Sequence, residues 1–143
     1  MKDGLNNQIV ETMFMVFRSL KETMSFSSKN MHITIVQLET LVFLGENKDV
    51  QMKDLADYFS ITMPTATSLI DKLIAVNLAE RKNYIKDRRI VKITITNFGK
   101  KILDLAMKQR ASKVNKILSD LSKDDKKEFL RLLSTILEKH QIV

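Results

Sequence analysis

The stretch that decides the fold is NYIKDRRIVKITIT, residues 83–96. It begins with a cationic loop around a single acid, Asp87, and continues as an alternating strand. The cations gathered in and beside this loop are Arg81, Lys82, Lys86, Arg88, Arg89 and Lys92. In the strand, apolar residues at 91, 93 and 95 alternate with polar residues at 92, 94 and 96, the period-two pattern of a half-buried strand. The rest of the chain has helical periodicity, so this stretch predicts a basic hairpin that contacts a polyanion while helices hold it in place.

The composition indicates a folded chain with an anionic partner. Its 143 residues are enough for one domain or one compact unit with an appendage. The formal net charge of +7 favours nucleic acid or a membrane surface as the partner, although a merely soluble basic protein has the same balance. The membrane surface is disfavoured because the basic residues lie on a predicted hairpin and not on a basic amphipathic helix.

The residue types give little support to catalysis. The chain has no cysteine, and its two histidines, His32 and His140, are each alone on their segments. No metal-ligand spacing and no Ser-His pairing is therefore visible. With three glycines there is also no Gly-rich phosphate loop. We expect no enzymatic activity, no metal and no cofactor. No apolar run approaches the ~20 residues that span a bilayer, and no signal-peptide core is visible, so we expect a cytoplasmic protein with no membrane partner.

Helical patterns cover most of the chain. Helices are predicted over residues 5–25, from Thr34 to a stop at Gly45, over 52–59, from Pro64 onward, over 98–119 capped by Thr96, and from Ser122 onward. Thr34 and Gln37 have the spacing of a capping box. Residues 25–30 read as a loop, and residues 78–82 as the first strand of the hairpin. The helices before and after the tight turn Ser60-Ile61-Thr62 form a helix-turn-helix pattern.

The order of elements predicts a mainly α fold with a small β-hairpin (α+β), a winged helix-turn-helix with N- and C-terminal dimerisation helices. We assign residues 33–111 to the winged helix-turn-helix and residues 1–32 and 112–143 to a helical dimerisation region, within one compact chain. The end helices carry more apolar surface than one small domain could cover. Uncovered apolar stripes imply a partner, and a second copy in a two-fold dimer is the economical one.

Several motifs resemble those of the MarR-type (multiple antibiotic resistance regulator) transcription factors. The matching stretches are Leu55-Ala56-Asp57-Tyr58-Phe59, residues 65–73, Leu78-Ala79-Glu80-Arg81, and Asp87-Arg88-Arg89 followed by Ile93-Thr94-Ile95-Thr96 and Gly99. The resemblance covers the element order of the whole chain, with motif-level similarity from about residue 34 to 110. It implies a homodimeric winged-helix regulator, usually a repressor, bound to a short palindrome of double-stranded DNA. It also implies a cleft where small, often phenolic or aromatic, molecules bind and weaken DNA affinity.

The helix that begins at Pro64 is the predicted recognition helix. Its apolar face is Ala66, Leu69, Ile70, Leu73 and Ile74, and its predicted DNA-binding residues are Pro64, Thr65, Thr67, Ser68 and Lys72. Such a helix fits the major groove with its N-terminal residues towards the bases. It offers no arginine or asparagine, so we expect modest direct readout with a contribution from DNA shape. The alternative is that the Thr and Ser residues only cap and solvate a structural helix.

In the wing, Arg89 is our candidate for the minor groove, where a narrow A·T tract concentrates negative potential. Lys86 and Arg88 are expected to meet phosphates. Asp87 is expected to orient Arg89 through a charge-assisted hydrogen bond, a role that the family resemblance supports. The alternative is a solvated run of charges at the tip of a hairpin.

A ligand cleft could be bordered by soft and aromatic side chains, which suit a flat organic molecule. The candidates are Met13, Phe14, Phe17, Met24, Phe26 and Met31, with His32 as a possible contact for an anionic ligand. Ordinary core and dimer packing is the alternative for each of them. A rival for the chain as a whole is a winged-helix protein-interaction module whose wing binds an acidic protein partner.

Overall fold

A computed structural model of the chain describes residues 4–84 and 87–140, with the side chains of 22–23, 84–90 and 140 outside the description. The described residues form two units that meet in the chain between Arg110 and Ala111. Within the described residues, no helix combines the length and the apolar composition that crossing a bilayer requires.

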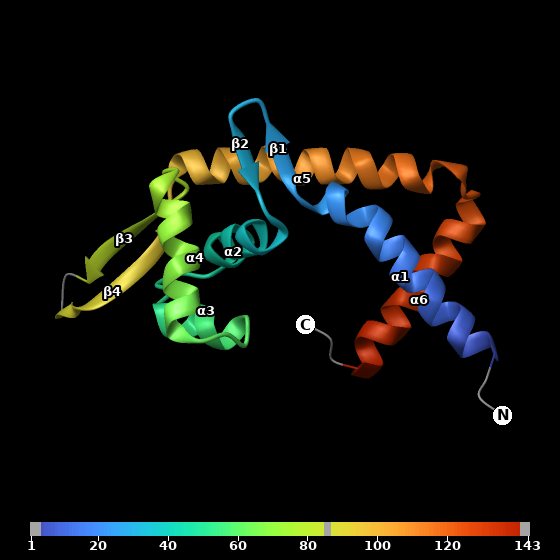
Figure 1. Cartoon of the computed structure of the whole chain (residues 1–143), viewed down its shortest axis with the longest axis horizontal. Helices are drawn as coiled ribbons and strands as arrows, with labels where there is room; N and C mark the ends of the chain where they lie inside the picture. The colour runs from blue at the N-terminus through green and yellow to red at the C-terminus, as the bar shows by residue number, and fades with distance from the viewer. Residues whose placement is uncertain (1–3, 85–86, 141–143) are drawn as a thin grey trace. The chain divides into compact units, whose positions relative to one another are not determined.

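Helices alternate with two short hairpins along the chain (Figure 1). The elements are α1 (Gly4–Met24), β1 (Phe26–Ser28), β2 (Met31–Ile33), α2 (Ile35–Glu46), α3 (Met52–Tyr58), α4 (Met63–Ala75), β3 (Ala79–Tyr84), β4 (Asp87–Ile95), α5 (Asn97–Ile117), a 3-10 turn (Leu118–Asp120) and α6 (Lys123–His140). β1 pairs with β2 and β3 pairs with β4, both antiparallel. The predicted fold class, mainly α with a small β-hairpin and a winged helix-turn-helix order, is confirmed.

The core of the first unit lies between α2, α3, α4 and the β3–β4 hairpin. Its fully buried large residues are Ile33, Leu38, Leu41, Leu55, Ile70, Leu73, Leu78 and Ile93. The loop before α3 joins this core through an isolated bridge, in which the Ile93 N–H donates to the Val50 carbonyl at 2.7 Å. The base of the wing is therefore part of the core.

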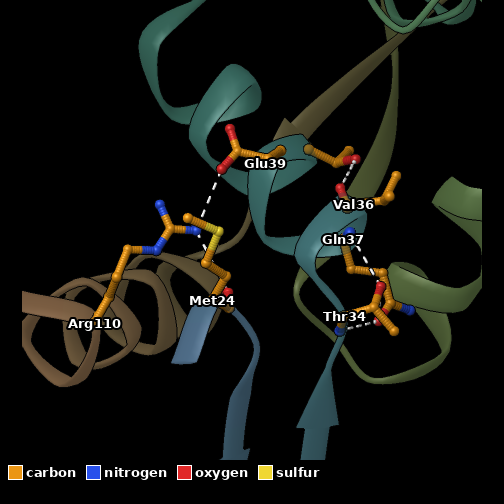
Figure 2. Close-up of polar contacts among 7 residues, drawn as sticks. Met24, Thr34, Val36, Gln37, Glu39 and Arg110 are labelled. Carbon is orange, nitrogen blue, oxygen red and sulfur yellow. Dashed lines mark hydrogen bonds and ion pairs between the residues drawn. The ribbon is translucent and has the colours of Figure 1, made fainter. Parts of the chain in front are cut away.

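Side-chain caps set the beginnings of the helices, as the sequence predicts. The Thr34–Gln37 capping box is present, with the Thr34 N–H donating to Gln37 Oε1 at 2.9 Å and the Gln37 N–H to Thr34 Oγ1 at 3.3 Å (Figure 2). Thr96 Oγ1 accepts from the Gly99 N–H at 2.8 Å at the start of α5. Ser122 and Asp125 make the same kind of reciprocal pair before α6.

Two local predictions are wrong. Residues 25–30 are not a plain loop, because Phe26–Ser28 pairs with Met31–Ile33 as a hairpin. Its cross-strand partners Phe26 and Ile33 are 6% and 1% exposed, so burial against the core stabilises the hairpin. Strands of three residues are too short to show the period-two pattern from which a strand is predicted. Gly45 does not stop α2, which continues to Glu46. Asn47 ends the helix instead, donating to the Phe43 carbonyl from both its backbone N–H and Nδ2.

Left-handed residues close the turns on both sides of α4. Ser60 has φ 52° in the turn after α3, and Asn77 has φ 58° after α4. The Leu78 N–H donates back to the Leu73 carbonyl at 2.9 Å, which is the long hydrogen bond of a Schellman ending. These turns orient α4 between the core and the first strand of the wing.

Gly99 lies so close to neighbouring atoms that a larger residue would not fit without a shift. A Cβ at this position would lie 2.1 Å from the Leu78 carbonyl oxygen and 2.8 Å from Ile95 Cγ1. We expect Gly99→Ala to lower the free energy of unfolding by about 1–3 kcal/mol or more, because backbone atoms must shift to accept the methyl group. Thermal or urea unfolding followed by circular dichroism measures this change.

Gly45→Ala is the matched control. Gly45 lies within α2, and a Cβ there would meet only Leu103 Cδ2 of α5, at an ordinary van der Waals distance of 3.6 Å. It should stabilise the chain by up to about 1 kcal/mol, the difference in helix propensity between the two residues. Equal effects of the two substitutions would contradict the close approach at Gly99.

Candidate nucleic-acid interface

The structure exposes the predicted DNA-binding side of α4. Ala66, Ile70 and Leu73 are fully buried, and Leu69 and Ile74 are half-buried, so the predicted apolar face packs on the core. Of the residues predicted to bind DNA, Pro64, Thr65, Ser68 and Lys72 are exposed and Thr67 is half-buried. They lie on the side of α4 that the core leaves free, so the helix can present them to a groove.

Hydrogen bonds within the first turn occupy two of the hydroxyls on this side. Thr62 caps α4, and its Oγ1 accepts from the Thr65 N–H at 3.4 Å and lies 2.9 Å from Thr65 Oγ1. Thr67 Oγ1 donates to the Met63 carbonyl at 2.9 Å. In the described part of the chain, Ser68 has no such internal hydrogen bond. The sequence identified these residues but could not say which hydroxyls stay available.

An ion pair links α4 to the β3–β4 hairpin. Arg81 Nη2 on β3 lies 2.7 Å from Asp71 Oδ1 on the exposed side of α4. Both side chains are partly exposed, at 39% and 54%, so the pair contributes little to stability but restrains the two elements relative to each other. Figure 1 places the β3–β4 hairpin beside α4. Sequence reasoning missed this contact, because nothing local marks Asp71 as the partner of Arg81.

Two further cations of the basic stretch are also paired with acids. Lys82 Nζ lies 2.8 Å from Glu80 Oε1 on the same strand. Lys92 Nζ lies 2.7 Å from Asp49 Oδ1, and its side chain is only 13% exposed. Val91, predicted to face the core with Ile93 and Ile95, is 41% exposed, because the core ends at Ile93. Three cations of the basic stretch, Arg81, Lys82 and Lys92, are therefore ion-paired.

The prediction that the remaining wing residues lie on a loop is wrong for three of them. Asp87 pairs with Tyr84, so β4 already begins at Asp87 and includes Arg88 and Arg89. The register shifts between Asn83 and Tyr84, whose partners are Val91 and Asp87. Lys86 lies outside the described residues, as do the side chains of Asp87, Arg88 and Arg89, so their DNA-binding roles stay predictions.

Two hollows lie on the same unit, around the β1–β2 hairpin. The larger has a volume of about 430 Å³ and is lined by Lys21, Ser25, His32, Thr34, Ile35 and Val36. The smaller, of about 140 Å³, shares His32 and reaches Lys72 and Val76 at the end of α4. His32 Nδ1 lies 2.8 Å from Ser27 Oγ across the β1–β2 hairpin.

Of the ligand candidates, His32 lines both hollows and Met31 lines the smaller one. Phe26 is buried in the core, Met31 packs against the core and borders the smaller hollow, and Met13, Phe14 and Phe17 are exposed along α1. The larger hollow is thus lined mainly by polar and aliphatic residues that the sequence did not single out. No group of acidic residues and histidines suited to a metal ion occurs among the residues that the structure describes.

Arg110 ties α5 to the two elements on either side of the β1–β2 hairpin (Figure 2). Its Nη2 donates to Glu39 Oε1 on α2 at 3.2 Å and to the Met24 carbonyl at the end of α1 at 3.5 Å. Its Nε is buried and finds no hydrogen-bond partner in the described part of the chain. No local pattern in the sequence marks this contact, because its three residues are far apart along the chain.

Known proteins with the same arrangement are regulators of transcription. The MarR family model matches residues 33–90. The transcriptional repressor YetL of Bacillus subtilis is 22% identical over 96% of this chain and 83% of its own length. The crystal structure of the transcriptional regulator BldR from Sulfolobus solfataricus is 31% identical, with a TM-score of 0.69 over 97% of this chain and 99% of that one. Streptococcus pneumoniae FabT, solved in complex with DNA, is 21% identical with a TM-score of 0.79 over 95% of this chain and 97% of its own. With its helix-turn-helix and its basic hairpin, the chain belongs to the MarR family and is a DNA-binding transcriptional regulator.

Proposed function

We propose that this regulator is a homodimeric repressor that binds a palindromic operator, with α4 in the major groove and the β3–β4 wing in the minor groove. The observation that carries the proposal is the Asp71–Arg81 ion pair, which couples an exposed recognition helix to a basic hairpin. In a dimer, two copies of α4 and its wing that lie about 34 Å apart can contact successive turns of a DNA duplex. The repressor assignment is supported by relatives named as repressors, YetL and MdtR of Bacillus subtilis.

The dimer is supported by apolar surface that a single chain leaves open. On α1, the exposed apolar residues include Leu5 at 66%, Met13 at 63%, Phe14 at 71% and Phe17 at 57%. In the second unit, α6 exposes Phe129, Leu130, Leu132, Leu133, Ile136 and Leu137. Contiguous apolar stripes of this kind mark interfaces, and a second copy supplies the complementary stripes.

Within the proposed complex, each predicted site residue has a role. Thr65, Thr67, Ser68 and Lys72 face the major groove with Pro64 at the start of the helix. Arg89 enters the minor groove, oriented by Asp87, and Lys86 and Arg88 meet phosphates. Dimer geometry decides affinity, because both wings must reach their grooves at once.

A small aromatic or phenolic effector is part of the proposal. The hollow beside Lys21 and His32 has a volume of about 430 Å³, within the range of small-molecule sites. A ligand there can release DNA only if it binds better to a dimer whose recognition helices are wrongly spaced. The more tightly such a ligand binds the wrongly spaced dimer than the DNA-binding dimer, the more it would weaken operator binding.

Selection from random DNA duplexes with the purified chain tests the proposed function. We expect recovery of a palindrome whose half-sites are about one helical turn apart. If the chain bound DNA at low salt but enriched no particular sequence, operator recognition would be contradicted. Poly-glutamate and unlabelled duplex can be compared as competitors for the labelled duplex at equal concentrations of negative charge. If poly-glutamate competed equally well, the wing would instead belong to a module that binds an acidic protein.

Arg89→Ala should weaken operator binding by about 30-fold or more, because each dimer loses two groove contacts worth about 1–3 kcal/mol each. Fluorescence anisotropy with the selected duplex measures the loss, and light scattering should still give a dimer. Arg89→Lys is the control, since it keeps the charge without the planar guanidinium, and it should recover only part of the affinity. Wild-type affinity of Arg89→Ala would remove this residue from the interface.

Lys86→Ala should flatten the dependence of log affinity on log salt concentration. Each neutralised phosphate contributes about 0.9 to this slope, so a dimer that loses two contacts should lose about 1.8. Lys82→Ala is the matched control on the same hairpin, because Lys82 is already ion-paired with Glu80 at 2.8 Å. Anisotropy titrations across a series of salt concentrations measure both slopes. Equal changes in the two variants would contradict the phosphate role of Lys86.

Phe14→Asp should shift the chain towards monomers and abolish tight operator binding. A buried Phe contributes about 1.5–3 kcal/mol, and a two-fold interface contains it twice. Multi-angle light scattering across a dilution series measures the dissociation. Gln8→Asp, which adds the same charge at an exposed polar position of α1, should leave the dimer intact. A dimer of unchanged stability in Phe14→Asp would place the interface elsewhere.

A further inference from the structure

The first turn of α4 presents apolar groups at the end that a recognition helix directs to the bases. Met63 is the first residue of the helix, and its side chain is 47% exposed. Helical side chains lean towards the N-terminus, so Met63 reaches beyond the start of α4. Pro64 follows it, is exposed, and has no backbone N–H.

Hydroxyl protons in the same turn are largely used within the helix. The only proton of the Thr67 hydroxyl goes to the Met63 carbonyl at 2.9 Å, so this side chain offers a methyl group and acceptor lone pairs. One of the two hydroxyl protons of Thr62 and Thr65 is used in the hydrogen bond between them at 2.9 Å, which leaves this pair one free O–H donor. The other side chains of α4 with free donors, Ser68 and Lys72, lie further along the helix.

This chemistry discriminates between base pairs. In the major groove guanine presents two acceptors, N7 and O6, and is read by donors, which the first turn of α4 largely lacks. Thymine presents a C5-methyl group, and apolar side chains read it by contact. An exposed thioether with three rotatable bonds adapts to such a methyl group.

We propose that Met63 is a specificity-determining residue that reads the C5-methyl group of a thymine in each half-site, so that the start of α4 selects an A·T pair by apolar contact. This inference rests on the proposed function, because it needs α4 in the major groove. It adds a residue outside the five assigned to the recognition helix from the sequence, and it assigns the type of base pair.

Deoxyuridine tests the contact directly, because it differs from thymidine only by the missing methyl group. Each thymine of the selected operator is replaced in turn, and affinity is measured by anisotropy with the full-length chain. At one position we expect a loss of about four-fold for one half-site and about 15-fold for both, the values for losing one and two buried methyl groups. Replacements outside the contacted base pair should leave affinity unchanged.

Variants of Met63 assign the effect to this side chain. In Met63→Ala the difference between thymine and uracil at that position should fall below about two-fold, because the apolar partner of the methyl is gone. Met63→Leu keeps an apolar group and should keep the difference. Met107→Ala is the matched control, since Met107 on α5 is exposed to a similar extent, at 40%, and should leave the difference unchanged.

The outcomes separate the two proposals. If a palindrome is selected but no uracil replacement matters, or if Met63→Ala retains full discrimination, the reading by Met63 is overturned and the proposed function stands. If no sequence is enriched at all, both are overturned. Position-specific loss that disappears in Met63→Ala and persists in Met63→Leu establishes the contact.

Discussion

The wing depends on a junction where the backbone of Gly99 lies against the Leu78 carbonyl. This carbonyl accepts from the Thr96 N–H at 3.1 Å, and Thr96 Oγ1 donates to the Asn77 carbonyl at 2.7 Å. The residues that leave α4 are thereby joined to the residues that enter α5. The hairpin between them is closed at its base, and a side chain at position 99 would force this base apart. The orientation of the basic strand relative to α4 and α5 therefore follows from this junction.

Ion pairs limit the positive field at the base of the wing. Arg81, Lys82 and Lys92 each have a carboxylate within 3 Å, and Lys92 is largely buried. Each of these pairs is close to neutral, so the three cations contribute little to the field beyond the wing. The described part of the wing is thus an ion-paired stem.

Local chemistry made much of this fold predictable from the sequence. Thr34 with Gln37, Pro64 in the first turn of α4, and Thr96 before Gly99 are signals within a few residues, and the structure bears them out. The β1–β2 hairpin and the contacts of Arg110 were not predictable, because burial and distant acceptors stabilise them. The same limit applies at the site: the sequence identified the exposed side of α4, but the partners of Thr67 and Arg81 required the fold.

Asp49 combines two tasks that other residues could perform only separately. Its φ of 61° lies in the left-handed region, which glycine adopts without strain, and its carboxylate holds Lys92 at 2.7 Å. Glycine at this position would relax the turn but remove that carboxylate from a largely buried ammonium group. Asparagine would tolerate the turn and leave only a neutral acceptor. Replacing Asp49 with glycine or asparagine would therefore preserve the shape of the backbone but remove the negative charge at the base of the wing.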